Sequence, residues 1–221
     1  MRIGILGSGL MGGTLGTILT RAGHEVVFSY SRSQRKLQRL AKEAGGRARA
    51  GTPADAVADA DAVLLAVHWS RLDDVLDQTG TMAGKTIVTC SLPMTKNDSR
   101  LVLGLTTSGA EMLAARRRNV HVVSAFSTAT SEVFPSVFEK RRQKKRPSLV
   151  FCGDHTGAKK TAAKLIRDVG FDPVDVGELS AARYIEPFAL LLAEIAYEAP
   201  FGGELAYRFE HLGRRARSNR T

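Results

Sequence analysis

Met1-Arg-Ile-Gly-Ile-Leu-Gly-Ser-Gly-Leu-Met-Gly-Gly13 opens the chain with a short apolar run that leads directly into a Gly-x-Gly-x-x-Gly turn and then a helical pattern over residues 14–21. In such a strand–turn–helix unit the first glycine permits the tight turn, the second lets the backbone approach a pyrophosphate, and the third lets the helix pack on the strand. The N-terminus of the helix directs free N–H groups at the phosphates. We therefore expect a dinucleotide to bind at Gly7, Ser8, Gly9, Leu10, Met11 and Gly12.

The strand expected over residues 25–30 ends about 20 residues beyond the glycines, where NAD-binding chains place an Asp or Glu. This chain has no acid there and reads Ser-Arg-Ser-Gln-Arg-Lys over residues 31–36. Arg offers planar, charge-assisted donors to a 2′-phosphate, and Ser adds a short donor. A solvated helix start with surface cations is the alternative interpretation. We favour NADP, with its 2′-phosphate bound by Ser31, Arg32, Ser33 and Lys36.

Apolar runs at residues 62–67, 86–90 and 120–125 have the continuous character of strands buried in a parallel sheet. Helical patterns separate them, and this alternation produces parallel sheets through right-handed crossovers. We predict an α/β fold, a Rossmann-type doubly wound and mostly parallel sheet with a small C-terminal α/β extension. The expected parts are a nucleotide-binding domain over 1–127, a smaller part that closes the cleft over 128–212, and a disordered tail over 213–221.

Local signals in the later chain predict an edge strand and two helix caps. Residues 171–176 form the edge strand, because Pro173 cannot donate a hydrogen bond to a neighbouring strand. Ser70 and Asp154 each precede a helical pattern, and both residue types favour the N-cap position.

The carboxyl ends of parallel strands are where doubly wound folds bind their ligands. Three of the expected strands lead there into aromatic, hydroxyl or histidine side chains. His68 is explained nearly as well by a structural role, and Trp69 and Phe126 either flank a planar ring or belong to the core. We place Val67, His68, Trp69, Pro93, Phe126 and Ser127 among the expected cofactor-binding residues.

Composition indicates a soluble globular protein, with 43% hydrophobic and 24% charged residues. Cys90 and Cys152 lie in strand-like runs, so we expect buried thiols in a reducing, cytoplasmic compartment. The most apolar late stretch, residues 188–196, is too short to span a bilayer, so no membrane partner is expected. The apolar helix expected over residues 180–198 could pack on its copy, which makes a homodimer plausible.

The formal net charge of +10 is concentrated in the segments 116–118, 140–146 and 214–217. No stacking aromatic residues are interleaved with the cations of 140–146, so no specific nucleic-acid partner is expected. The histidines have no metal-site spacing to Cys, Asp or Glu, and no metal is predicted.

A resemblance to the coenzyme F420-dependent NADP oxidoreductases extends to about Leu212. It is carried by the glycine turn, Ser31-Arg32, Val67-His68-Trp69, 122–125, Cys152-Gly-Asp154, 170–175 and 203–207. The resemblance implies hydride transfer between NADPH and a deazaflavin. It places the pyrophosphate at Gly7 to Gly12, the 2′-phosphate at Ser31, Arg32 and Lys36, and the nicotinamide at Val67, His68, Trp69 and Pro93.

Ser127 departs from the family pattern, which usually has a His or Asn at this position, and this weakens the case for deazaflavin more than that for NADP. FMN or FAD is the alternative acceptor, and reduction of ferric ions or of a small imine is the alternative reaction. A non-catalytic NADP-binding redox sensor is a hypothesis of another class. Transfer between two bound cofactors depends on positioning and requires no catalytic acid or base. Arg141 and Lys145 are hypothesised to attract the anionic deazaflavin tail.

Overall fold

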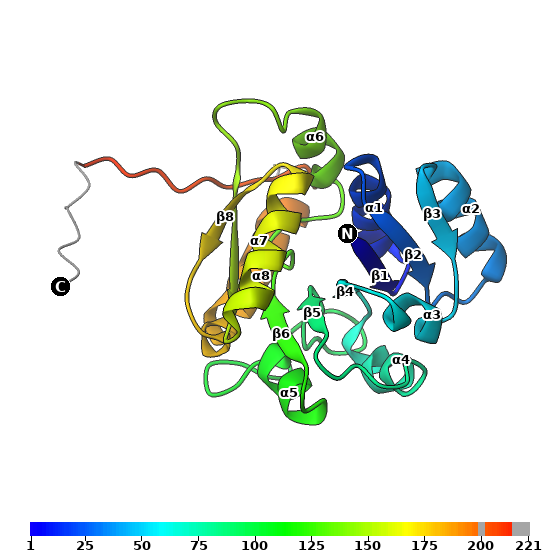
Figure 1. Ribbon diagram of the computed structural model, residues 1–221. Helices are drawn as coiled ribbons and strands as arrows, with labels where there is room; N and C mark the ends of the chain where they lie inside the picture. Colours follow the sequence, from blue (N-terminus) through cyan, green and yellow to red (C-terminus); the bar gives the residue numbers. More distant parts are fainter. Residues whose placement is uncertain (199–201, 214–221) are drawn as a thin grey trace.

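The computed structural model describes residues 1–198 and 202–213 (Figure 1). Its strands are β1 Arg2–Leu6, β2 Glu25–Ser29, β3 Arg47–Ala50, β4 Ala62–Leu65, β5 Thr86–Thr89, β6 His121–Ser124, β7 Ser148–Gly153 and β8 Asp172–Asp175. They form one sheet in the order β3-β2-β1-β4-β5-β6-β7-β8. The first six strands run parallel, β7 is antiparallel to β6, and β8 is parallel to β7. The predicted Rossmann-type, mostly parallel sheet is confirmed.

Helices cover both faces of this sheet. They are α1 Leu10–Arg21, α2 Gln34–Ala44, α3 Pro53–Ala58, α4 Leu72–Asp77, α5 Gly109–Arg116, α6 Val133–Glu139, α7 Thr156–Val169 and α8 Ala182–Tyr197, with single 3-10 turns at Trp69–Arg71 and Leu179–Ala181. One apolar core joins the sheet to α1, α2, α6 and α7. The other joins the opposite face to α3, α4, α5 and α8. The two cores fix the strands, so their carboxyl ends form a rigid edge for a site.

Three local predictions need correction. Helix α1 begins at Leu10, four residues earlier than the pattern indicated, because the helix takes in Gly12 and Gly13 directly after the turn. Ser70 is not a helix cap, since it lies within a 3-10 turn and α4 starts only at Leu72.

Asp154 is not the cap of α7 either, because β7 continues to Gly153 and the helix starts two residues after Asp154. His155 is the N-cap, and its Nδ1 accepts the backbone N–H of Ala158 at 3.1 Å. Asp154 instead accepts the N–H of Leu179 at 2.8 Å. The predicted edge strand is confirmed, because β8 lies at the end of the sheet.

The segment 202–213 comes after α8 in the chain and is hydrogen-bonded to the start of β7 at Tyr207 and Phe209. Tyr207 accepts the N–H of Ser148 on its carbonyl at 2.8 Å and the N–H of Val150 on its hydroxyl at 3.0 Å. The sheet is continuous across residue 127, and the proposed division there stays a prediction. Of the tail predicted to be disordered, residues 214–221 lie outside the described residues. None of the helices in the described part is long and apolar enough to cross a membrane.

Candidate functional site

A cleft of about 840 Å³ opens at the carboxyl ends of β1, β2 and β4, and we call it the glycine cleft. The glycine turn, the start of α2, the segment 51–53 and α4 form its walls. Nine of the residues predicted from the sequence line it: Gly7, Ser8, Gly9, Ser31, Arg32, Ser33, Lys36, Val67 and His68. The two halves of the sequence fingerprint therefore meet in one cavity.

The three glycines of the turn differ in what a side chain would meet at each position. Gly7 has φ +104°, and a Cβ there would lie 2.4 Å from the carbonyl oxygen of Ala66. A Cβ on Gly12 would lie 1.9 Å from the carbonyl oxygen of Gly7, so the turn and α1 can approach only without a side chain. A Cβ on Gly9 would meet nothing within 4 Å. Gly9 is the N-cap of α1 and supplies no side-chain cap, which leaves the first N–H groups of a 12-residue helix available to an anion.

The start of α2 presents cations and hydroxyls to the same cleft. Ser33 caps the helix by accepting the N–H of Lys36 at 3.4 Å, and Ser31 accepts the N–H of Ser33 at 3.3 Å. Arg32 and Lys36 are exposed and form no ion pair with any described residue. The start of α2 and the residue pair before it thus carry positive charge that no described carboxylate neutralises.

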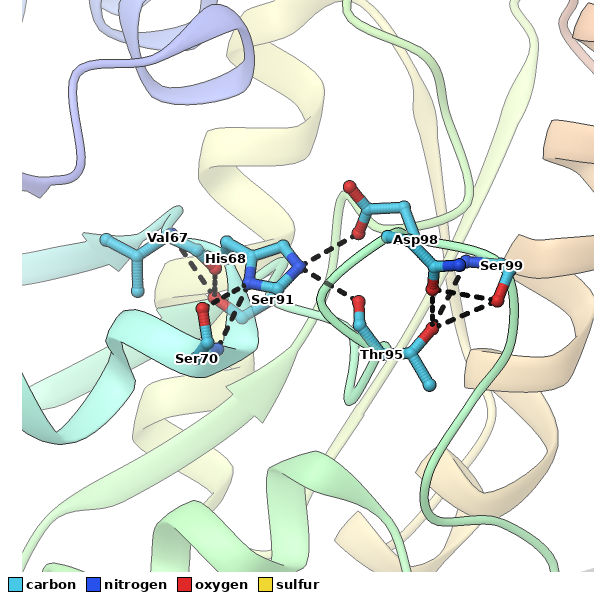
Figure 2. Close-up of polar contacts among 8 residues, drawn as sticks. Val67, His68, Ser70, Ser91, Thr95, Asp98 and Ser99 are labelled. Carbon is cyan, nitrogen blue, oxygen red and sulfur yellow. Dashed lines mark hydrogen bonds and ion pairs between the residues drawn. The ribbon is translucent and has the colours of Figure 1, made fainter.

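His68 connects the glycine cleft to the loop that follows β5 (Figure 2). Its Nδ1 accepts the backbone N–H of Ser70 at 3.1 Å, so the ring proton resides on Nε2. Nε2 donates to Asp98 Oδ1 at 3.0 Å and faces the carbonyl oxygen of Thr95 at 3.2 Å. Figure 2 shows the ring between Ser70 on one side and Thr95 and Asp98 on the other. The imidazole therefore holds the 95–99 turn against the end of β4.

A second cleft, of about 480 Å³, lies on the other side of this turn, and we call it the α8 cleft. Its walls come from the start of α1, the segment 90–94 after β5, the segment 127–131 after β6, and α8. Leu10, Met11 and Ser127 are the predicted residues that line it. The hydroxyl oxygen of Ser127 is buried and has no hydrogen-bond partner among the described residues.

The structure places four of the predicted residues outside both clefts. Gly12 packs under the turn, Pro93 is buried beside Gly109, and Trp69 lies under the guanidinium of Arg116 at 5.6 Å from the ring centroid. Phe126 is 1% exposed and packs in the core, edge to face with Phe134. Their roles as direct cofactor contacts stay predictions.

Arg141 and Lys145 of the basic segment 140–146 contact residues outside the two clefts. The guanidinium of Arg141 lies over the ring of Phe138 at 3.9 Å, and Lys145 pairs with Glu210 at 3.7 Å. Neither residue lines the glycine cleft or the α8 cleft. The hypothesis that they attract the tail of a cofactor therefore has no geometric support.

Sequence reasoning missed two titratable groups near the clefts. Tyr30 donates a hydrogen bond to Asp74 across the glycine cleft, and burial together with this contact raises the pKa of Tyr30 to about 12. Glu186 is 2% exposed and accepts the N–H groups of Gly109 and Ala110 at 2.9 and 3.1 Å. Burial raises the pKa of Glu186 to about 7, against those two hydrogen bonds. The available signal was a Glu directly before Pro187 in a mainly apolar helix.

Both cysteines are buried, as predicted. Burial raises the pKa of each thiol to about 12. Cys90 lines the α8 cleft as a protonated thiol. Within residues 1–198 and 202–213, no group of three or more His, Cys, Asp or Glu is placed to hold a metal ion.

The chain is similar to several proteins of known family or structure. Residues 2–93 match the family described as NADP oxidoreductase, coenzyme F420-dependent. The chain is 32% identical over 194 residues to the metalloreductase STEAP3 of Rattus norvegicus, which covers 86% of this chain and 37% of that protein. The chain therefore spans little more than a third of the length of this curated relative.

Solved structures share the fold. A candidate F420-dependent NADP reductase from Arthrobacter sp. FB24 matches with a TM-score of 0.83 and 22% identity, over 96% of this chain and 100% of that one. A reductive aminase from Aspergillus terreus in complex with NADPH matches with a TM-score of 0.63 and 20% identity, over 90% of this chain and 62% of that one. Residues 2–93, which contain the glycine turn and the cationic start of α2, thus belong to the coenzyme F420-dependent NADP oxidoreductase family.

Proposed function

We propose that this chain is an NADPH-dependent oxidoreductase that transfers hydride between NADP(H) in the glycine cleft and an acceptor in the α8 cleft. The observation that carries the proposal is the pair of exposed cations, Arg32 and Lys36, beside the glycine turn where an NAD-binding chain has a carboxylate. The family match and the NADPH complex of the reductive aminase support the same nucleotide.

The residues of the glycine cleft fit this cofactor. Gly7 and Gly9 with the start of α1 would hold the pyrophosphate, and Arg32 with Lys36 would hold the 2′-phosphate. When bound, the dinucleotide supplies a hydride from its nicotinamide ring. The chain contributes positioning and exclusion of water, because Leu10 and Met11 follow the glycine turn directly and line the α8 cleft.

Several acceptor classes are compatible with this proposal. The family description names coenzyme F420. FMN and FAD are alternative acceptors. The curated relative is a metalloreductase, and a solved neighbour is a reductive aminase. A redox sensor that binds NADP without turnover is the second candidate function. It differs from the enzyme in one testable property, because it would bind NADPH without oxidising it.

Titration calorimetry with NADPH and NADH tests the nucleotide assignment. Arg32→Asp should weaken NADPH binding about 10- to 100-fold, because a hydrogen bond to a charged group contributes about 1.5–3 kcal/mol. NADH binding should change little. Arg35→Asp is the matched control, since Arg35 lies on the same helix turn but does not line the cleft. An unaltered preference in Arg32→Asp would show that Arg32 does not bind the 2′-phosphate.

Absorbance assays of NADPH oxidation test turnover, with F420, FMN, FAD and a cyclic imine offered in parallel. Oxidation with at least one of them supports the enzyme. NADPH binding without oxidation by any of these acceptors would favour the sensor.

A further inference from the structure

The α8 cleft differs from the glycine cleft in charge. Its lining includes three carboxylates, Asp98, Glu194 and Glu198, and no Lys, Arg or His among the described residues. Glu194 and Glu198 are exposed at the end of α8, and neither has an ion-pair partner among the described residues. The remaining walls are apolar side chains and hydroxyls. The cleft is therefore an apolar cavity with a negative rim.

This local charge opposes the net charge of +10 carried by the whole chain. Lys96 and Arg100 flank Asp98 in the sequence but do not line the cleft. The segment 140–146 also lies outside it, with Arg141 on Phe138. A ligand inside the cleft therefore contacts carboxylates and no described cation.

We propose that the α8 cleft selects an acceptor with a positive charge on an apolar body, and that iminium ions are the class it takes. This inference rests on the proposed function and names its substrate. A phosphate- or carboxylate-bearing tail, such as those of FMN and deazaflavin cofactors, would meet Glu194 and Glu198 without a compensating cation from the described lining.

The chemistry of an iminium ion fits the side chains present. Hydride from NADPH forms a C–H bond at the iminium carbon, while the C=N π pair becomes the lone pair on nitrogen. NADPH is oxidised to NADP⁺, the iminium ion is reduced to a neutral amine, and the amine then takes a proton from water. No protein acid is needed, because the iminium nitrogen already carries the positive charge.

Two pairs of acceptors test the inference, each measured as kcat/KM at saturating NADPH. The first pair is riboflavin and FMN, which share one ring system and differ by a phosphate. The second pair is the N-methyl-3,4-dihydroisoquinolinium cation and 3,4-dihydro-2H-naphthalen-1-one, a neutral ketone of similar shape. We expect the cation to be reduced faster than the ketone, and FMN to be no better than riboflavin.

The double variant Glu194→Gln, Glu198→Gln separates charge from shape. It should lower kcat/KM for the cation roughly three- to tenfold, because exposed ion pairs are individually weak, and it should raise kcat/KM for FMN relative to riboflavin. The effect should shrink in high salt. Glu139→Gln is the control, since Glu139 is exposed and lines neither cleft.

The outcomes separate this inference from the proposed function. Faster turnover of FMN or F420 than of the cation, or an unchanged cation rate in the double variant, overturns the inference while the oxidoreductase stands. Calorimetry that detects no NADPH binding overturns the proposed function, and the inference with it. Retained cation preference with loss in the double variant supports both.

Discussion

Glu186 should make the protein less stable as the pH rises toward neutrality. Its carboxyl group is 2% exposed, within α8, and accepts the first two N–H groups of α5. Glu111 faces it from α5 and disfavours its charge, while Arg183 on α8 pairs with Glu111 at 2.7 Å. Asp154 and Lys159 lie near the same buried region, where they affect the thiol of Cys152. Glu186 thus links α8, which forms a wall of the α8 cleft, to the start of α5.

The size of the effect follows from the pKa of Glu186, which burial raises from 4.5 to about 7. At about 1.4 kcal/mol per pKa unit, this difference corresponds to about 3 kcal/mol. Between these two pKa values the folded protein holds a proton that the unfolded chain has released. The free energy of unfolding therefore falls as the pH rises from about 4.5 to about 7, and the loss is complete above that range.

Urea denaturation at pH 5, 6, 7 and 8 measures this dependence, with Glu186→Gln compared against the parent protein. The Gln variant cannot ionise, so its free energy of unfolding should fall by about 2.5 kcal/mol less than that of the parent between pH 5 and pH 8. It should be less stable at pH 5, because a neutral amide accepts one of the two N–H groups less well. Glu139→Gln, an exposed position, should keep the parent slope. Equal slopes for Glu186→Gln and the parent would refute the reasoning.

Two further predictions concern the glycine turn and the thiols. Gly12→Ala should lower the melting temperature of the nucleotide-free protein, because its Cβ would lie 1.9 Å from the carbonyl oxygen of Gly7. Gly9→Ala should keep that melting temperature and weaken only NADPH binding in calorimetry, because its Cβ would meet nothing within 4 Å. Equal melting temperatures for the two variants would contradict this reasoning. Cys90 and Cys152 should resist iodoacetamide at pH 8 in the folded protein, since burial raises both thiol pKa values to about 12, and mass spectrometry should find both alkylated in urea. Rapid alkylation of the folded chain would show that the thiols are accessible.

The nucleotide side of the fold was predictable because its determinants are local in the sequence. Gly7 and Gly9 act within a few residues of the strand they follow, and Ser31 to Lys36 directly succeed the next strand. The parallel order of neighbouring strands then brings the two segments together without any further information. Helix starts were less well predicted, because the first residue of a helix depends on where the preceding strand ends. The cap of α7 moved from Asp154 to His155 because β7 is one residue longer than its apolar run.

The acceptor side depends on contacts between distant segments, which no local pattern reveals. Glu186 meets Gly109 and Ala110 across more than 70 positions. Phe126 follows its strand as Val67 follows β4, yet φ +67° turns it into the core. The sequence position of an aromatic residue after a strand therefore did not determine which way its side chain points.

The electrostatic asymmetry between the two clefts links these observations to function. In the proposed function, the exposed cations Arg32 and Lys36 bind the 2′-phosphate of NADPH, and they would also attract any other anion that approaches the carboxyl edge of the sheet. The negative rim of the neighbouring cleft, formed by Glu194 and Glu198, would then disfavour a second anionic nucleotide in the space proposed for a cation. His68 and Asp98 lie at the boundary between the two clefts, because His68 lines the glycine cleft and Asp98, its hydrogen-bond partner, lines the α8 cleft. The hydrogen bond between them therefore connects the two clefts.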